Sequence, residues 1–406
     1  MYSVKSNLWA ARLVIFAAFF DLFLQFPVVA PYAEELGASP VYLGLIVGAF
    51  SASNIVGNIV AGLVIDRWGR KVPIEIGLVT TVLVLILYAV SSTPDQLLGT
   101  RLLHGLSVSV LTPGAFSMIG DSTTGGQRAR AMGISGTLIG LTAVTAPPLA
   151  GIMGDRLGFT AVFVGSAVVM LSVAVFFWLM THSQERHREI KNSEGKFLTG
   201  VVKIWTRPSL LLANFSVFGL TVANGTMITV LPINFSASES GMAFSVYAVI
   251  AVLVMGGPTN RLSDRWGRAQ ILGSSLGIMA IGLSIIAALE GFGFTLLGMA
   301  VFGLGFGLLF PAATALVADG SNIDERGGAF GMFYAVYSGG VVVGTFASGL
   351  IMDIFGDATR LPFAFAAGTV LLGAIVLITV SRVFKKSSAA GIFTAAPEFM
   401  RKTRNS

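Results

Sequence analysis

Three ionisable side chains stand inside otherwise apolar stretches of this chain of 406 residues. Asp21 lies midway along the first stretch, and Arg101 and His104 lie one turn apart in the fourth. A charge in the middle of a lipid bilayer costs at least about 2.5–3.5 kcal/mol, so such groups normally face a cavity or a partner. A carboxyl group that resists ionisation there could bind and release a proton. We therefore hypothesise that Asp21 recognises a proton or a cation, with Arg101 tuning its charge and His104 assisting.

Two alternatives to this hypothesis stay open. Asp21 and Arg101 could neutralise each other as a structural pair, and His104 could be a polar replacement that hydrogen-bonds a neighbour. The stretches hold further polar groups that either line a cavity or join helices by hydrogen bonds. These are Gln25, Asn54, Asn58, Asn224 and Tyr337. The 30 Phe and 14 Met residues would supply an adaptable apolar wall to such a cavity.

The composition indicates a membrane protein. Hydrophobic residues make up 54% of the chain and charged residues only 11%, whereas soluble proteins carry about 25% charged residues. A span needs roughly 20 mostly apolar residues. We therefore predict an all-α membrane protein whose twelve spans lie near 9–32, 42–64, 73–92, 97–118, 131–154, 159–181, 208–233, 242–262, 270–289, 293–317, 329–351 and 361–383.

The basic residues set a direction for these spans. Lysine and arginine collect on the cytoplasmic side of multi-pass proteins, and all but three of the 26 here fall on one face of the predicted topology. The exceptions are Arg101 inside a span and Arg156 and Arg360 on the opposite face. We therefore expect both termini to be cytoplasmic, in an inner or plasma membrane.

The longest polar stretch divides the chain six spans from six. We predict an N-terminal six-helix bundle over 1–181, a cytoplasmic linker over 182–207, a C-terminal six-helix bundle over 208–384 and a basic cytoplasmic tail over 385–406. Apolar and basic residues alternate in the linker, which favours a short helix at the membrane interface. A linker without fixed structure fits the same residues. The tail's charge suits contact with anionic lipid.

Several functions find no support in the residues. Cys is absent, so thiol chemistry and disulfides are excluded. We find no phosphate-binding loop, paired acids, nucleophile–base motif or metal cluster, and we therefore expect no enzyme, no metal and no cofactor. The scattered basic residues argue against nucleic acid. We expect a monomer whose partners are a small-molecule substrate, protons and the lipid bilayer.

The chain contains an internal repeat. The segment Asp66–Arg70 recurs unchanged as Asp264–Arg268, 198 positions later, and no gap is needed from the second span to the end of the fifth. Parallel repeats of this kind usually build transporters, with a substrate site between the halves near the midplane of the membrane. Other acidic residues matched by the same offset are Asp121 with Asp319 and Asp155 with Asp353.

The two halves differ where special residues stand. A repeat built only for packing should be symmetric, so the differences mark function better than the matches. All three differences place the unusual residue in the N-terminal half: Arg101 maps to Met299, Pro147-Pro148 maps to Thr345-Phe346, and Asp21 falls near Val222 when Pro31 is aligned with Pro232.

The segment Gly62–Lys71 resembles the loop between spans two and three of the major facilitator superfamily. Its copy after the eighth span is degraded, with Asn260 at the leading Gly position. The resemblance implies two six-helix bundles related by a pseudo-two-fold axis, and a polar latch on the outward-facing state. Arg70 is expected to pair with Asp121; anchoring by positive charge alone is the alternative for this loop. The residues assigned to the latch are Gly62, Asp66, Arg67, Gly69, Arg70, Lys71, Asp121, Asp264 and Arg268.

Two more segments narrow the resemblance to twelve-span drug:proton antiporters. Arg101–Gly105 is similar to the Arg-x-x-Gln-Gly element of proton-coupled members, with His104 in place of Gln. The fifth span matches the antiporter signature in spacing, although Thr or Ala stands at three of its Gly positions. Ordinary packing of small residues is the alternative there. The matching residues are Gly133, Thr142, Ala146, Pro147, Ala150 and Gly151.

These features favour a secondary transporter that works by alternating access, exporting small amphiphilic or drug-like compounds in exchange for protons. An importer or facilitator of sugar-like or other metabolites is the main alternative, although such proteins usually carry more polar cavities. Export of a lipid-like or siderophore-like metabolite is also open. A membrane enzyme or sensor is the remote alternative, and transport into vesicles would separate it from the rest.

Overall fold

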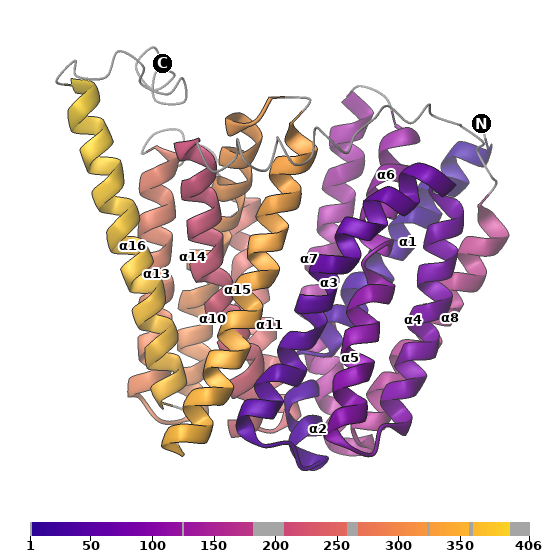
Figure 1. The fold of residues 1–406 in the computed structure, drawn as a ribbon, viewed down its shortest axis with the longest axis horizontal. Coiled ribbons are helices and arrows are strands. Elements are labelled where there is room, and N and C mark those ends of the chain that lie inside the picture. The colour runs from indigo at the N-terminus through magenta and orange to yellow at the C-terminus, as the bar shows by residue number, and fades with distance from the viewer. Residues whose placement is uncertain are drawn as a thin grey trace. The chain divides into compact units, whose positions relative to one another are not determined.

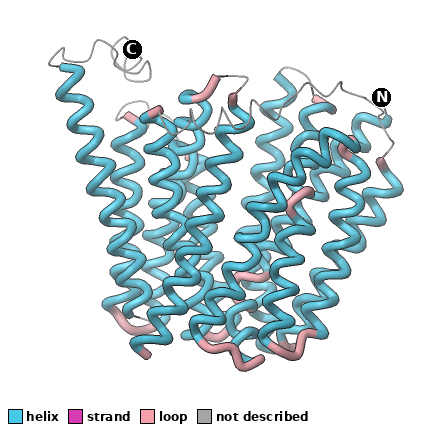
Figure 2. The backbone as a smooth tube through the Cα atoms, viewed as in Figure 1, coloured by secondary structure: helices cyan, strands magenta, loops and turns pink. Residues whose placement is uncertain are grey.

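The computed structural model describes residues 2–123, 126–181, 207–257, 267–322, 325–356 and 360–389. Every regular element in these ranges is a helix, and Figures 1 and 2 show helices joined by short loops. Among the described residues, twelve helical segments are long and apolar enough to cross a membrane. The predicted all-α fold with twelve spans is therefore confirmed. The predicted interfacial helix in the linker lies outside the described residues.

The helices follow one another as the apolar stretches predict. The first six spans are built from α1 (Tyr2–Leu24), α2 (Val29–Glu35), α3 (Pro40–Trp68), α4 (Lys71–Val90), α5 (Pro94–Val108), α6 (Leu111–Asp121), α7 (Gly126–Leu157) and α8 (Phe159–Met180). The second six are α10 (Pro208–Asn234), α11 (Ala237–Gly256), α13 (Arg268–Ala288), α14 (Phe292–Gly320), α15 (Arg326–Phe355) and α16 (Arg360–Ala389).

The chain divides into two compact units by its internal contacts. Unit 1 comprises residues 1–191 together with 228–245 and 345–358, and unit 2 comprises 192–227, 246–344 and 359–406. Unit 1 therefore takes the ends of α10, α11 and α15 into its own packing. Its core is a continuous apolar cluster that includes Val14, Ile15, Leu85, Phe163 and Phe177.

Two predicted spans are interrupted, each next to a proline. The first helix ends at Leu24 instead of near residue 32, and α2 begins at Val29. Pro27 stands in the turn between them, and proline has no N–H to continue the helical bonds. Asp21 therefore lies one turn before the end of α1, close to the break. The fourth span likewise breaks between α5 and α6, four residues before Pro113.

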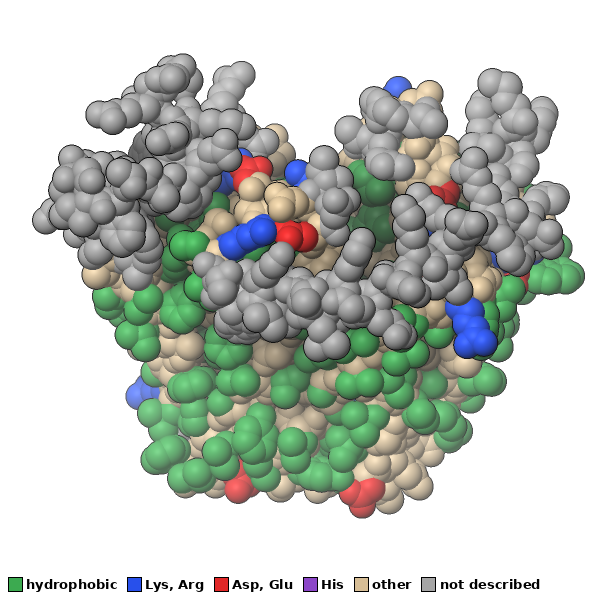
Figure 3. Space-filling model, turned by 45° about the horizontal axis from the view of Figure 1, so that its top comes forward, with side chains coloured by type: hydrophobic (Ala, Val, Ile, Leu, Met, Phe, Trp, Pro, Cys, Tyr) green, Lys and Arg blue, Asp and Glu red, His purple; other side chains and the backbone are tan. Residues whose placement is uncertain are grey.

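The outer surface is apolar along the flanks of the helices. In the view of Figure 3, hydrophobic side chains cover much of the visible flank and charged side chains are few. Leu83, Val168 and Leu372 are each more than half exposed. Such a surface is stable in contact with lipid and would be an aggregation site in water.

Small residues let pairs of helices approach closely within unit 1. A Cβ added at Gly151 of α7 would lie 2.2 Å from the carbonyl oxygen of Ala237, at the start of α11. A Cβ added at Gly349 of α15 would lie 2.5 Å from the carbonyl oxygen of Pro40, at the start of α3. Gly151 and Gly349 are related by the repeat, so both halves use the same packing device.

Candidate functional site

A cluster of polar side chains lies buried in unit 1, around the end of α1. Asp21, Gln25, Arg101 and His104 are exposed by 2%, 4%, 6% and 0% respectively. Oδ2 of Asp21 accepts a hydrogen bond from Nε2 of Gln25 at 3.1 Å and lies 3.0 Å from Nε2 of His104. Oδ1 of Asp21 accepts from the hydroxyl of Ser166 in α8 at 2.7 Å. The carboxyl group therefore faces three polar partners in an apolar bundle.

The contact between Asp21 and His104 is close but poorly aligned. The two atoms are close, but the ring N–H is not aimed at the carboxylate oxygen, and Nε2 has no other partner. The interaction is therefore electrostatic more than it is a well-aligned hydrogen bond.

Arg101 is fixed by the backbone of α3 and by the amide of Gln25. Its Nε donates to the carbonyl of Ile46 at 3.2 Å and its Nη2 to the carbonyl of Val47 at 2.8 Å. Its Nη1 donates to Oε1 of Gln25, and its guanidinium lies 5.0 Å from the centre of the Phe50 ring. The buried cation thus has acceptors on several sides and an aromatic face beside it.

A close contact between α5 and α3 explains why glycine stands at position 105. A Cβ at this position would lie 2.2 Å from the carbonyl oxygen of Phe50 in α3. Because only glycine allows this approach, α5 comes close enough to α3 for Arg101 to reach the carbonyls of Ile46 and Val47. Asn54 reinforces the contact by donating to the carbonyl of Gly105 at 3.1 Å.

Asp21 and Arg101 do not form an ion pair in the part of the chain that the structure describes. The amide of Gln25 lies between them and bonds to both. The ionisable side chain in contact with Asp21 is His104, to which the sequence analysis gave only an assisting role. Asn58 belongs to the periphery, because it is exposed and donates to Oδ1 of Asn54 at 2.7 Å.

Two members of the cluster were missed by sequence reasoning. The hydroxyl of Tyr88 in α4 lies 3.2 Å from Nδ1 of His104 and 3.4 Å from Nη1 of Arg101. Ser166 is the other. Both stand in apolar helices where a single hydroxyl gives no pattern. The repeat held a signal for Tyr88, since the offset maps it to Ile286.

A tyrosine of α2 ties the cluster to the short helix after the break. The hydroxyl of Tyr32 donates to the carbonyl oxygens of Tyr88 and Ser91, both at 2.9 Å. A tyrosine hydroxyl keeps its hydrogen at neutral pH and can therefore donate here. These bonds hold the end of α4, and hence Tyr88, in place.

The loop between α3 and α4 carries the predicted contact between Arg70 and Asp121. Nε of Arg70 lies 3.0 Å from Oδ2 of Asp121, with both side chains partly exposed. The repeat reproduces it, because Arg268 pairs with Asp319. Gly69 has a φ of 78°, a conformation that favours glycine and lets the chain turn between the helices.

The other residues assigned to the latch lie around this pair. Nζ of Lys71 donates to the carbonyl of Thr181 at 2.7 Å and lies 3.6 Å from Glu75. Gly62, Asp66 and Arg67 are exposed or have open space beside them. Asp264 lies outside the described residues.

The residues of the antiporter-type signature all lie on α7, but only some of them take part in its contact with α11. Thr142, Ala146, Pro147 and Ala150 are buried. Pro147 and Gly151 face the first turns of α11, where a Cβ on Gly241 would meet the carbonyl of Pro147 at 2.4 Å. Gly133 has no atom within 4 Å of an added Cβ. The close contact therefore lies at the C-terminal half of α7.

Asp155, at the end of the same helix, caps α11. Its carboxylate accepts from the backbone N–H of Ala237 at 3.1 Å and of Ser238 at 2.9 Å. Ser236 and Glu239 complete a capping box at the same helix end. A carboxylate at a helix N-terminus is favoured by the free N–H groups and by the helix dipole.

Unit 2 holds a buried polar group of a different kind. The side chain of Asn224 in α10 hydrogen-bonds Tyr247 of α11 and Tyr337 of α15. The ring of Tyr247 packs edge-on against Phe302 and Phe306 of α14, with centroids 5.5 and 5.3 Å away. This Asn224 cluster contains no charged side chain.

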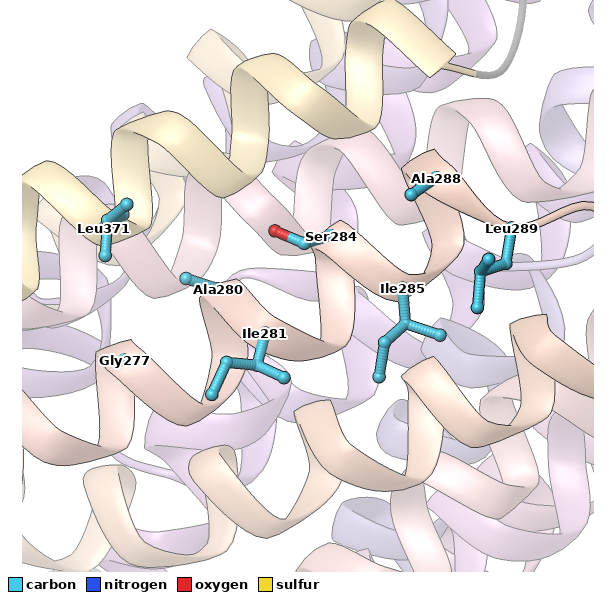
Figure 4. A pocket seen from close by; sticks show the side chains of 8 residues that line it. All are labelled: Gly277, Ala280, Ile281, Ser284, Ile285, Ala288, Leu289 and Leu371. Atoms are coloured by element: carbon cyan, nitrogen blue, oxygen red, sulfur yellow. The ribbon is translucent and has the colours of Figure 1, made fainter.

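A shallow groove on unit 2 is apolar. It is lined by one face of α13, together with Leu371 of α16 (Figure 4). Ser284 supplies its one polar side chain. Without converging polar groups, the groove fits a lipid chain better than a recognition site.

Comparison with known proteins defines the class. The family model of the Major Facilitator Superfamily matches residues 13–234 and 215–401, so the chain belongs to that superfamily of secondary transporters. The model of the chain is similar in fold to a variant of the nucleoside transporter NupG (TM-score 0.78, 13% identity, 92% of this chain and 99% of that one). A bacterial homologue of the lysosomal transporter Spinster gives the same TM-score at 16% identity, over 95% and 98% of the two chains.

Relatives by sequence narrow the resemblance. The chain is 26% identical over 369 residues to Multidrug resistance protein 1 of Bacillus subtilis, covering 90% of this chain and 93% of that protein. It is 24% identical to the Quinolone resistance protein NorA of a Staphylococcus aureus strain, covering 90% and 95%. The predicted resemblance to drug:proton antiporters is confirmed as a distant one.

Proposed function

We propose that this transporter exports small amphiphilic compounds in exchange for protons, and that Asp21 is the proton site. The observation that carries the proposal is the buried contact between Asp21 and His104, held by Gln25 and Ser166. A carboxyl group surrounded by movable donors can exist with or without its proton. In the other repeat, Met299 and Phe302 stand where Arg101 and His104 stand here.

The substrate class follows from what surrounds the charges. Unit 2 offers neutral tyrosines, one asparagine and phenylalanine rings, which suit a partly apolar and flat molecule better than a sugar. The distant relatives are named as multidrug and quinolone resistance proteins, which supports the same substrate class. In this proposal Asn224 and Tyr337 touch the substrate, and Asn54 and Asn58 support the packing of α3.

The proposal also includes the predicted membrane topology and the predicted latch. Both termini face the cytoplasm, and the division at the linker over 182–207 separates two halves that rock against each other. The latch around Arg70 and Asp121 breaks as they do so. Such surface pairs contribute about 0–1 kcal/mol each, small enough to be exchanged during a cycle.

The test uses proteoliposomes with a pH-sensitive dye trapped inside and a pH gradient imposed across the membrane. Candidate amphiphilic cations are added to vesicles that hold the intact chain, Asp21→Asn or Asp353→Asn. We expect the compound to collapse the gradient with the intact chain and with Asp353→Asn, an exposed carboxylate in the other repeat, and not with Asp21→Asn.

Other outcomes assign other functions. Substrate movement that needs no gradient and survives Asp21→Asn would make the protein a facilitator whose buried charges are structural. Accumulation inside the vesicles together with protons would make it an importer. No movement of any compound that binds would favour a membrane protein that does not transport.

A further inference from the structure

The amide of Gln25 has only one possible orientation. The guanidinium of Arg101 can donate but never accept, and two of its nitrogens are anchored to the backbone carbonyls of Ile46 and Val47. Its remaining nitrogen, Nη1, therefore presents an N–H to the amide, and Gln25 accepts this hydrogen bond with its side-chain oxygen. The amide NH₂ is then forced to the other side, where Asp21 and His104 lie.

This orientation acts on one nitrogen of His104. The NH₂ of Gln25 lies 3.3 Å from Nδ1 of His104. The hydroxyl of Tyr88 lies 3.2 Å from the same nitrogen, and while its oxygen accepts from Nη1 of Arg101 its own hydrogen is free to be donated to the ring. Two groups that can donate therefore face Nδ1, and both are satisfied when this nitrogen carries no hydrogen and accepts. The single proton of the neutral ring lies on Nε2, beside Asp21.

We propose that Arg101 acts through Gln25 as a positioning pair that keeps His104 neutral, so that the transported proton binds Asp21 and never the imidazole. A cationic His104 would place a hydrogen on Nδ1, against the NH₂ of Gln25 and the hydroxyl of Tyr88. The groups that face the ring are Asp21, Gln25, Tyr88 and the ring of Phe50. On the Nδ1 side only the Tyr88 oxygen could accept that hydrogen, and it would have to turn its own hydrogen away from the ring to do so.

The same geometry chooses the oxygen of Asp21 that takes the proton. Oδ2 faces the NH₂ of Gln25 and Nε2–H of His104, both donors. Oδ1 faces the Ser166 hydroxyl at 2.7 Å, which can turn from donor to acceptor. An incoming proton therefore binds Oδ1, and Ser166 rotates to accept it, while the bonds at Oδ2 stay unchanged.

This inference deepens the proposed function and rests on it only in assuming that the bound proton is transported. The protonation state of the His104 ring can be measured independently of transport. The chain has three histidines, so replacing His182 and His187 with Asn leaves His104 as the only source of imidazole signals. Nitrogen-15 NMR of the histidine-labelled protein then reports each ring nitrogen from about pH 8 to about pH 5, the range in which a free imidazole becomes charged.

We expect one bare and one protonated nitrogen at every pH in the intact site. Gln25→Glu keeps an acceptor for Arg101 and offers no N–H to Nδ1, so a doubly protonated ring should appear as the pH falls. Tyr88→Phe is the matched control, because the NH₂ of Gln25 remains and the ring should stay neutral. A doubly protonated ring in the intact protein, or an Nδ1–H tautomer, overturns the proposal.

The result separates the two proposals. If the ring is neutral throughout and the dye assay shows no proton movement, the positioning role of Gln25 stands and antiport fails. If the ring becomes charged and Asp21-dependent proton movement is present, antiport stands and the positioning role fails.

Discussion

The two repeats share their packing and differ in their charges. Both pair an arginine of the repeated loop with an aspartate, Arg70 with Asp121 and Arg268 with Asp319. Both press a glycine against the first turn of another helix. Among the residues that the structure describes, only the first repeat buries a carboxylate, a guanidinium and an imidazole together, whereas the second buries Asn224 beside two tyrosines. Duplication therefore supplied a scaffold twice, and charge chemistry was confined to one copy.

The largest effect is expected where that chemistry is removed. Arg101→Met, the residue of the other repeat, removes the guanidinium that Gln25 links to Asp21, so the buried carboxylate keeps only neutral partners. The change should destabilise the protein by about 3–5 kcal/mol, as the loss of one charge from a buried charged network does. Adding Asp21→Asn should recover part of this loss, because the unpaired charge disappears. Thermal unfolding in detergent of both single variants and the double variant measures the coupling.

The matched control for this cycle is Met299→Leu, the same position in the other repeat, with an expected cost below about 1.5 kcal/mol. Additive effects of Arg101→Met and Asp21→Asn would mean that the two residues do not share one network.

A second prediction tests the shared packing. Gly151→Ala and Gly349→Ala should each cost about 1–3 kcal/mol, because the new Cβ meets backbone oxygen at 2.2 and 2.5 Å. Gly133→Ala and Gly331→Ala stand in open space on the same two helices and should be neutral or stabilising by up to about 1 kcal/mol. Melting temperatures of the four variants would show two pairs; unequal members within a pair would contradict the shared packing.

A third, smaller effect is expected from the loss of a helix cap that only the Asp155 side of the repeat provides. Asp155→Ala should cost about 0.5–2 kcal/mol, because it uncaps α11. Its counterpart Asp353 would face Ser39 and Pro40 by the same offset, and proline has no N–H to offer. Asp353→Ala should therefore change stability little. Hydrogen exchange at Ala237 and Ser238 gives the direct readout, and unchanged exchange in Asp155→Ala would remove the cap from the account.

The smallest effects belong to the surface ion pairs. Arg70→Ala and Arg268→Ala should each lower stability by no more than about 1 kcal/mol, since both partners are partly exposed. The loss should shrink in high salt, because screening already weakens such pairs. Unfolding of both variants at low and high ionic strength checks this, and a large, salt-independent loss in either would point to a buried role.

The fold could be predicted from the sequence because each span is long, apolar and bounded by polar residues. The break at Pro27 was missed because the apolar run continues on both sides of it, and position in the bilayer depends on where the helix stops. The contact between Arg70 and Asp121 followed from the loop's resemblance and from charge alone.

The composition of the buried cluster was only half predictable. The sequence reveals the ionisable residues Asp21, Arg101 and His104, because each stands among apolar residues. Their contacts depend on how α1, α4, α5 and α8 cross. The sequence considered an ion pair between Asp21 and Arg101, and the structure places Gln25 between them. Tyr88 and Ser166 are ordinary residues made important by position. The roles of all these residues in transport stay predictions.

The central claim is that one proton site, in the first repeat, is linked to substrate. The most direct measurement is proton release from the purified protein in weakly buffered detergent when an amphiphilic cation is added. We predict that the intact protein and Asp353→Asn release about one proton for each molecule bound, as a single linked site requires, and that Asp21→Asn binds without release. Equal release from Asp21→Asn would contradict the account and move the proton site elsewhere.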